Sequence, residues 1–358
     1  MTNVNSSRML VAESKVASAN AADSPDANLN RSWKQIVEPV EPFLHAVSRQ
    51  LIRQVNDFDP EIIPYAQYAL DSGGKHLRPA IVALSAGALG EVTDAHVTAA
   101  VIIEMVHLAT LVHDDVMDEA EIRRARPTLA ANWGNEIAVL FGDCLFAQAL
   151  KLAASFPTPE VCRAVAMATN TVCSGEILQT QFCRKFSRSR REYFRVIEMK
   201  TAELFALSCD LAAFLSGATT KRRAALRQFG AAFGTAYQVY DDCVDLVGTE
   251  ALAGKSLGTD LAKGKLTWPV LLAWERANAT DRARLETLVE NWQPENLSGV
   301  NEMLARYETF GPSQEVIVRY LEQARRALRA LPDTGGRAGL AGLADFLAQQ
   351  TDALAVCI

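Results

Sequence analysis

Two carboxylate residues lie one helical turn apart in the stretch that follows residue 104. Asp114 and Asp118 have the i, i+4 spacing that places side chains on one face of a helix, and Asp115 lies beside them. Two carboxylates this close repel each other unless a cation lies between them, and oxygen-only ligands are those that Mg²⁺ prefers. Because Mg²⁺ usually binds through a few carboxylates together with substrate phosphates, the pattern predicts a site for a metal and a diphosphate.

Arginines and a second aspartate motif strengthen this prediction. Arg123 and Arg124 follow the first motif, and their guanidinium groups match the geometry of phosphate oxygens. The aspartate spacing recurs at Asp241, Asp242 and Asp245, again inside an apolar helical stretch. A single run of this kind is also typical of the solvated end of a helix. Two copies on apolar helices favour a pair of motifs that face each other across one cavity.

A third candidate element combines glycines with cations. Residues 73–74 are both glycine and precede Lys75 and Arg78, so the backbone there can approach an anion closely. His107 lies seven residues before Asp114, which places it on the same helical face. Taken alone, the glycines and cations also fit a turn followed by a solvent-facing helix start. A lone histidine on an apolar helix is more often a core residue.

The order of these elements along the chain resembles a known family. From roughly residue 40 to 350 the sequence is similar to the trans-isoprenyl diphosphate synthases, also called the polyprenyl synthetase family. The matching blocks are residues 73–79, His107 with the first aspartate motif and its arginines, 175–179, 200–202, Gln238 with the second aspartate motif, and 254–267. Six blocks in the same order are far more specific than any one of them.

The resemblance implies both an activity and the residues for it. It implies a Mg²⁺-dependent prenyltransferase that condenses isopentenyl diphosphate with an allylic diphosphate by ionisation, condensation and proton elimination. The catalytic residues would be Asp114, Asp115, Asp118, Lys200, Asp241 and Asp242. Isopentenyl diphosphate would be held by Lys75, Arg78, His107 and Arg124. The allylic diphosphate would be held by Arg123, Lys200, Thr201, Gln238, Lys255 and Lys265. The resemblance also implies three Mg²⁺ ions per active site, held by Asp114, Asp118, Asp241, Asp115 and Asp245.

Composition limits the other classes of function. Of the 358 residues, 49% are hydrophobic and 22% are charged, which is typical of a globular protein with a large core. A net charge of −6 without a basic tract argues against nucleic acid as a partner. No uncharged apolar run predicts a stable membrane span. The scattered cysteines, without a CxxC pair, indicate a reducing compartment, so we expect a cytoplasmic location.

The elements that carry these residues are expected to be helices. Residues 1–31 are rich in Ala, Ser and Asn and predict a disordered tail, and residues 32–358 would form the polyprenyl synthetase domain. Hydrophobic residues recur there at helical spacing, and no strand-like alternation of any length is present. We therefore expect an all-α, single-domain bundle of ten or more helices around a central apolar cavity, in agreement with the type I isoprenoid synthase fold that the resemblance implies.

The length of the product depends on residues before the first motif. A growing chain would pass Ala109 and Thr110, then Val106, one to two helical turns before Asp114. Short-chain members of the family have aromatic residues at the first level, whereas these three are small or aliphatic. We expect a medium or long product of about six or more isoprene units, although aromatic residues on other helices, such as Phe146, could close the tunnel sooner.

Other readings remain open at this stage. The alternatives are a short-chain farnesyl or geranylgeranyl diphosphate synthase, a class I terpene cyclase, and a non-catalytic partner subunit. A cyclase would carry a different second metal motif and need no site for isopentenyl diphosphate, and silent subunits usually lose one aspartate motif. The resemblance also implies a homodimer. The allylic primer, the exact product and the pathway served do not follow from the sequence.

Overall fold

Helices make up nearly all of the regular structure in the part of the chain that is described. The computed structural model describes residues 33–71, 74, 76–124, 126–249 and 256–355. The tail expected over residues 1–31 lies outside these ranges, and so do Lys75 and Lys255. The all-α bundle expected from the sequence is confirmed, with more than ten helices in the described residues.

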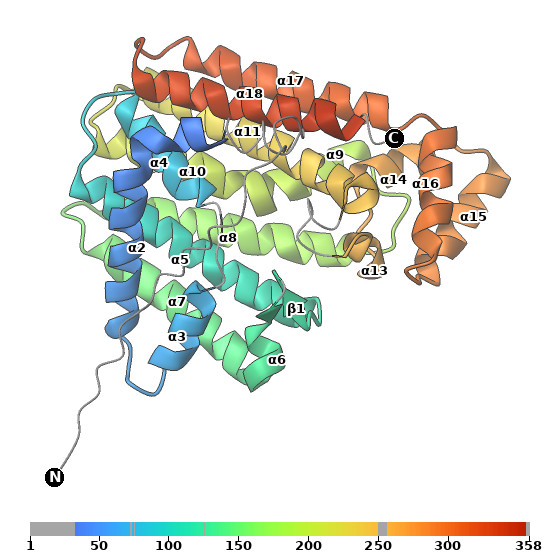
Figure 1. Cartoon of the computed structure of the whole chain (residues 1–358), viewed down its shortest axis with the longest axis horizontal. Helices are drawn as coiled ribbons and strands as arrows, with labels where there is room; N and C mark the ends of the chain where they lie inside the picture. Colours follow the sequence, from blue (N-terminus) through green and yellow to red (C-terminus); the bar gives the residue numbers. More distant parts are fainter. Residues whose placement is uncertain (1–32, 72–73, 75, 125, 250–255, 356–358) are drawn as a thin grey trace, which may run out of the picture.

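The elements run along the chain in the following order (Figure 1). They are η1 (Glu38–Val40), α2 (Glu41–Asn56), α3 (Ile63–Leu70), α4 (Leu77–Gly87), α5 (Asp94–Met117), β1 (Ile122–Arg123), β2 (Arg126–Pro127), α6 (Leu129–Trp133), α7 (Asn135–Ala154), α8 (Pro159–Phe182), α9 (Arg190–Ile197), η2 (Glu198–Ala202), α10 (Glu203–Leu215), α11 (Thr220–Val247), α13 (Thr259–Ala262), α14 (Trp268–Arg276), α15 (Ala279–Glu290), α16 (Asn296–Arg306), α17 (Phe310–Leu328) and α18 (Gly335–Ala355).

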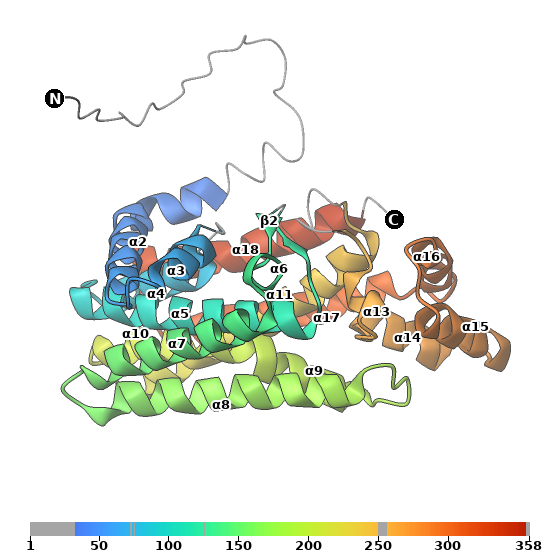
Figure 2. The ribbon, with the colours of Figure 1, turned by 90° about the horizontal axis from the view of Figure 1, so that it is seen from below.

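The two helices that carry the aspartate motifs belong to different parts of the core. Helix α5 packs against α7 and α2 in one hydrophobic cluster, and α11 packs against α17 in another. Helices α4 and α10 contribute residues to both clusters. Both helices contact α5, and α10 also contacts α11. Helix α8 runs along one outer side of the bundle, while α15 and α16 stand at the end opposite α2 (Figure 2). The core therefore holds α5 and α11 in two different hydrophobic clusters.

Local sequence explains where the two long helices begin and end. Thr93 and His96 form a capping box at the start of α5, and the Thr219 side chain caps the start of α11. Both aspartate motifs lie at the C-terminal ends of these helices, where the helix dipole disfavours negative charge. Carboxylates gathered at such ends require cations nearby.

The structure differs from the sequence-based expectation in two short segments. A two-residue hairpin, in which β1 pairs with β2, follows the first motif where no strand was expected. Its formation depends on the turn between Arg123 and Arg126, not on hydrophobic alternation. The helical spacing over residues 189–215 predicts one continuous helix, but this stretch is divided into α9, a π-helical turn over Glu198–Ala202, and α10. Short π-helical turns are often found at functional sites, and this one carries Lys200 and Thr201.

Two helices are long and apolar enough to cross a membrane by length and composition alone. They are α5, which is mostly buried inside the protein, and α7, which is partly buried. Both pack against each other within the bundle. Core helices of globular proteins meet the same criterion, so these helices are explained by the core, and no membrane span is confirmed.

Candidate active site

A large cavity lies between the C-terminal ends of α5 and α11. Its volume is about 1180 Å³, above the usual range for small-molecule sites. Residues from many parts of the chain line it, among them Asp114 and Asp118 of α5, Glu176 of α8, Lys200 of the π-helical turn, Asp241 of α11 and Lys265 beyond α13. The cavity thus brings together both aspartate motifs and the lysines that the sequence placed with them.

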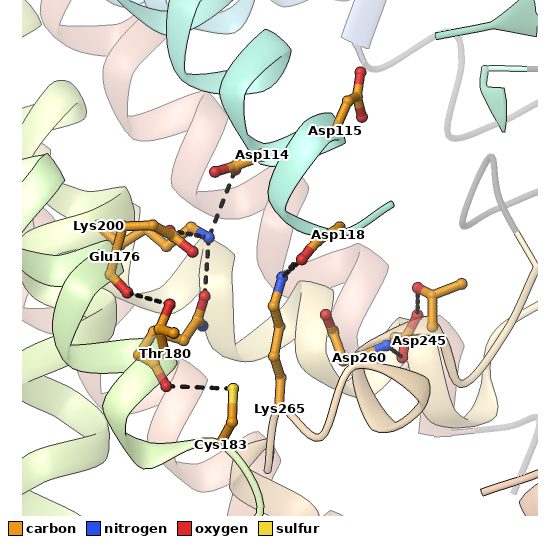
Figure 3. A network of polar contacts seen from close by, with 12 residues as sticks. Asp114, Asp115, Asp118, Glu176, Thr180, Cys183, Lys200, Asp245, Asp260 and Lys265 are labelled. Carbon is orange, nitrogen blue, oxygen red and sulfur yellow. Dashed lines mark hydrogen bonds and ion pairs between the residues drawn. The ribbon is translucent and has the colours of Figure 1, made fainter. Parts of the chain in front are cut away.

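Each aspartate of the first motif is paired with a cation, and Figure 3 shows the pairs of Asp114 and Asp118. The Lys200 ammonium lies 3.5 Å from Asp114, and the Lys265 ammonium lies 2.7 Å from both carboxylate oxygens of Asp118. Arg123 donates a hydrogen bond of 2.7 Å to Asp115, which is almost fully buried. Burial raises the pKa of Asp115, although Arg123 opposes this effect. The charge of the first motif is therefore balanced by residues from three other segments.

Lys200 is held in place by a close approach of two helices. The backbone of the π-helical turn passes very near to α8. A Cβ at Gly175 would lie 2.8 Å from the backbone nitrogen of Lys200. The ammonium group contacts Glu176 and donates a hydrogen bond of 2.9 Å to Gln179. Burial disfavours its charge, but Asp114 and Glu176 outweigh burial and raise the pKa of Lys200. Lys200 is thus a charged donor that faces the first motif.

The second motif is arranged differently. Asp241 lines the cavity, whereas Asp242 accepts hydrogen bonds from the Tyr193 hydroxyl at 2.5 Å and from the Gln238 amide at 2.8 Å. Burial, together with the nearby charge of Asp260, raises the pKa of Asp242 to about 7. The Thr201 hydroxyl donates to Gln238 at 2.7 Å. Thr201 and Gln238, both expected to contact the allylic diphosphate, therefore connect the π-helical turn to Asp242.

Asp245 does not occupy the position expected of a metal ligand. Its side chain is buried and does not line the cavity. It accepts hydrogen bonds from the Thr259 hydroxyl at 2.8 Å and from the Asp260 backbone N–H at 3.1 Å (Figure 3). Its backbone carbonyl also accepts a hydrogen bond from Gly258. In this structure the carboxylate anchors the start of α13, and its expected role in holding a metal stays a prediction.

A smaller cavity of about 380 Å³ adjoins the first one, and Arg78 and Arg124 line it. Arg78, His107 and Arg124 line both cavities, so the two are neighbours. Burial and the neighbouring arginines lower the pKa of His107 well below its ordinary value, which makes it a neutral imidazole. The Arg78 guanidinium lies over the Phe205 ring at 4.6 Å. Arg78 and Arg124 therefore bring two guanidinium groups to a cavity beside the carboxylates, and its expected use for isopentenyl diphosphate stays a prediction.

The chain-length residues are divided between the cavity and the core. Thr110 lines the large cavity, whereas Ala109 and Val106 are fully buried in the core and do not line it. The rotation of α5 about its own axis turns Ala109 and Val106 away from this cavity, and their expected effect on product length stays a prediction. The apolar part of the lining includes Leu111 of α5, Phe146 of α7 and Val172 of α8.

Several polar residues of the site had no role in the sequence-based expectation. Glu176 and Gln179 belong to a recognised block but had been given no function, and their contacts with Lys200 now supply one. Tyr193 and Glu104 were missed because neither belongs to a motif with charge or spacing of its own. Only the fold places Tyr193 against Asp242 and Glu104 inside the smaller cavity.

The donor set of the large cavity fits a hard divalent cation. Among the described residues, no group of three or more His, Cys, Asp or Glu side chains forms a ready-made metal site. Asp114, Asp118 and Asp241 nevertheless face one cavity and offer only carboxylate oxygens. Such a set suits a cation that completes its coordination with water and substrate phosphates, as Mg²⁺ does.

An all-α bundle with two aspartate motifs at one cavity and a cationic cavity beside it defines an isoprenoid synthase of the diphosphate-dependent class. Comparison with known proteins gives the family. Residues 59–306 match the model described as "Polyprenyl synthetase", and the chain belongs to this family.

The most similar proteins agree with this result. The chain is 34% identical over 343 residues to heptaprenyl diphosphate synthase component 2 of Bacillus subtilis (strain 168), covering 95% of this chain and 98% of that protein. A decaprenyl diphosphate synthase structure from Rhodobacter capsulatus has a TM-score of 0.84 and 31% identity, covering 89% and 99% of the two chains. A polyprenyl synthase structure from Caulobacter crescentus CB15, complexed with calcium and isoprenyl diphosphate, has a TM-score of 0.84 and 30% identity, covering 88% and 97%.

These similarities identify the reaction. The protein is a polyprenyl diphosphate synthase, a transferase that condenses isopentenyl diphosphate with an allylic diphosphate, and it belongs with the medium- and long-chain trans-prenyl synthases. The short-chain, terpene cyclase and non-catalytic alternatives are not favoured. A divalent metal is the cofactor of the family, and calcium accompanies isoprenyl diphosphate in the Caulobacter crescentus protein.

Proposed function

We propose that the protein is a Mg²⁺-dependent synthase that extends an allylic diphosphate to an all-trans product of six or more isoprene units. The observation that carries the proposal is the pairing of two different cavities. One combines carboxylates with lysines, and the other is lined by Arg78, Arg124 and the neutral His107. Two diphosphates that require different partners would bind side by side at this junction.

Asp114, Asp118 and Asp241 would hold the metal, with Asp115 in support, and the family resemblance favours three Mg²⁺ ions. When bound, Mg²⁺ would stabilise the negative charge that develops on pyrophosphate as the allylic C–O bond breaks. In the present structure Lys200 and Lys265 pair with the carboxylates. Both lysines are within reach of an allylic diphosphate in the same cavity, and they would donate hydrogen bonds to its oxygens.

The other residues would organise the second substrate and exclude water. Arg78 and Arg124 would bind the diphosphate of isopentenyl diphosphate as fork-shaped donors, and His107 would donate as a neutral imidazole. The apolar lining from α7 and α8 would hold the allylic chain and keep water from the carbocation that forms on ionisation.

The product length is proposed from the apolar part of the large cavity. Phe146 lines this part, and its ring lies 5.7 Å from the ring of His113. His113 fits over Gly142 of α7, where any larger residue would meet the imidazole at 2.1 Å, and its ring nitrogen lies 3.0 Å from the Val139 carbonyl oxygen. This packed pair forms a boundary of the cavity beyond the aspartates, and small residues such as Thr110 leave room before it.

The exposed surface of α7 and α8 supports a homodimer. Leu140, Met167 and Ile177 are 61%, 65% and 60% exposed, and Val139 is 40% exposed. Large apolar side chains gathered on two adjacent helices favour a protein interface. A second copy of this chain is the proposed partner, in a cytoplasmic location. Because one relative is named as component 2 of its synthase, a different second chain is the alternative.

The function is tested with purified protein, Mg²⁺, isopentenyl diphosphate and each of several allylic primers. We expect trans products of six or more isoprene units, and chromatography of the dephosphorylated alcohols measures their length. Sedimentation of the same sample distinguishes a homodimer from a monomer. Products that stop at fifteen or twenty carbons contradict the length, and activity only after addition of a second protein contradicts the homodimer.

A further inference from the structure

The smaller cavity contains a carboxylate that a diphosphate site does not need. Glu104 lies one helical turn before His107 on α5, and its side chain is 17% exposed. It lines the cavity together with Arg78 and Arg124. A negative charge here opposes the binding of an anion unless another group compensates it.

The compensating group is a histidine in a rare backbone conformation. His76 is the residue before α4 and has φ 45° and ψ 44°, the left-handed region that side chains other than glycine seldom adopt. Its Nδ1 lies 3.1 Å from the Glu104 carboxylate. A strained residue persists when its surroundings hold it in place, and Glu104 is the hydrogen-bond partner that does so.

The position of His76 determines the positions of the cations on both sides. It connects Gly74 to Arg78, whose Nε is buried and has no hydrogen-bond partner among the described residues. On the other side, the Arg124 guanidinium lies so close to Gly74 that a Cβ there would meet it at 3.0 Å. A change in the backbone at His76 would therefore move Arg78 and alter the space that Arg124 occupies.

We propose that Glu104 and His76 form a positioning ion pair that shapes the binding site for isopentenyl diphosphate without touching the reacting atoms. The pair holds the segment before α4 in the conformation that directs Arg78 into the cavity. It also neutralises Glu104, so that the net charge facing the substrate stays positive. This inference rests on the proposed use of the smaller cavity for isopentenyl diphosphate.

Protonation of His76 makes the pair sensitive to pH. The hydrogen bond to the Glu104 carboxylate raises the pKa of His76 above its ordinary value of 6.5, while burial and Arg124 oppose the increase. The other titratable and charged groups around this cavity are His107, Arg78, Tyr237, Tyr240 and Asp241. His76 is charged below its raised pKa and loses its charge as the pH rises through it. The uncompensated Glu104 then repels the diphosphate, so KM for isopentenyl diphosphate should rise.

The test uses Glu104→Gln and His76→Asn, since asparagine tolerates the left-handed conformation better than most residues. Each single variant should raise KM for isopentenyl diphosphate roughly tenfold, with KM for the allylic primer nearly unchanged. Each should also lose the rise of KM that the wild type shows between about pH 6 and about pH 9. The double variant restores a neutral hydrogen bond, so its KM should lie below the value expected from adding the two single effects.

Two controls make the outcome specific. Glu203→Gln removes a carboxylate of the same 17% exposure from an ion pair with Arg227, outside both cavities, and should leave both KM values unchanged. Arg78→Ala tests the assignment of the cavity itself. A selective rise of KM in Arg78→Ala but not in Glu104→Gln overturns the ion pair alone. Equal effects of Arg78→Ala on both substrates overturn the assignment. A lower KM for isopentenyl diphosphate in Glu104→Gln would show that the carboxylate only repels the substrate.

Discussion

The two aspartate motifs share one sequence pattern but occupy different environments. In the first motif all three carboxylates are paired with cations, namely Lys200, Arg123 and Lys265. In the second motif, Asp242 and Asp245 are buried and accept hydrogen bonds from uncharged groups. Only Asp241 and Asp242 of the second motif line the large cavity.

From this difference we infer that some aspartates bind the metal and the diphosphate, whereas others stabilise the neighbouring segments of the chain. Ion pairs between a carboxylate and a lysine can be exchanged when a metal and a diphosphate enter, because each charge finds a new partner. The hydrogen bonds of Asp245 instead fix Thr259 and Asp260 at the start of α13, close to the segment that carries Lys265. A repeated motif therefore does not imply repeated roles, and the comparison predicts unequal effects for equivalent substitutions.

The largest effects should come from aspartates that face the cavity. Asp114→Asn and Asp241→Asn should each lower kcat/KM by roughly three orders of magnitude or more, because electrostatic stabilisation of the leaving group is lost. Steady-state assays with isopentenyl diphosphate measure this, and circular dichroism checks the fold. Asp345→Asn, which removes a carboxylate from a surface pair with Arg325, is the matched control and should retain full activity. Near-normal turnover in either cavity variant contradicts the metal assignment.

A smaller loss is expected for the equivalent substitution at the end of the second motif. Asp245→Asn keeps one acceptor but loses charge-assisted hydrogen bonding to α13, so kcat/KM should fall about ten- to a hundredfold. The Mg²⁺ concentration for half-maximal rate should remain close to that of the wild type. A large shift in the Mg²⁺ concentration for half-maximal rate would show that Asp245 holds a metal, and it would contradict the difference between the motifs.

Product length tests whether the growing chain occupies the part of the large cavity between the aspartate motifs and Phe146. Thr110→Phe adds a ring to the cavity wall and should shorten the product by one or more isoprene units, as sized by chromatography. Ala109→Phe is a contrasting variant, because Ala109 is fully buried in the core. It should instead destabilise the protein by about 1–3 kcal/mol through overpacking. Unchanged products from Thr110→Phe would place the growing chain elsewhere.

The smallest expected effect concerns stability at the other end of α5. Burial lowers the pKa of His96 below its ordinary value of 6.5. Below that value the unfolded chain binds more protons than the folded protein, so the free energy of unfolding decreases as the pH falls. The contribution is complete above pH 6.5 and is lost at lower pH. His96→Gln preserves the capping box and should reduce the fall in Tm between about pH 7.5 and about pH 5.5. An identical fall in both proteins contradicts the role of His96.

The sequence predicted the features that depend on local spacing. Helix periodicity, the two aspartate motifs and the cations near them are all visible within short segments. The rotation of α5 is not local, since it depends on packing against α7, and this is why Ala109 and Val106 were placed in the tunnel. The π-helical turn at Lys200 depends on the close approach of Gly175, which has no sequence signal of its own. The pairing of Glu104 with His76 joins residues 28 positions apart.

The division between the motifs is tested most directly by measuring the binding of pyrophosphate by calorimetry, with and without Mg²⁺. Wild type and Asp245→Asn should bind pyrophosphate far more tightly with Mg²⁺ than without it. Asp114→Asn and Asp241→Asn should lose this Mg²⁺-dependent gain. Equal losses in Asp241→Asn and Asp245→Asn, or a wild type that binds equally well without Mg²⁺, would contradict the account.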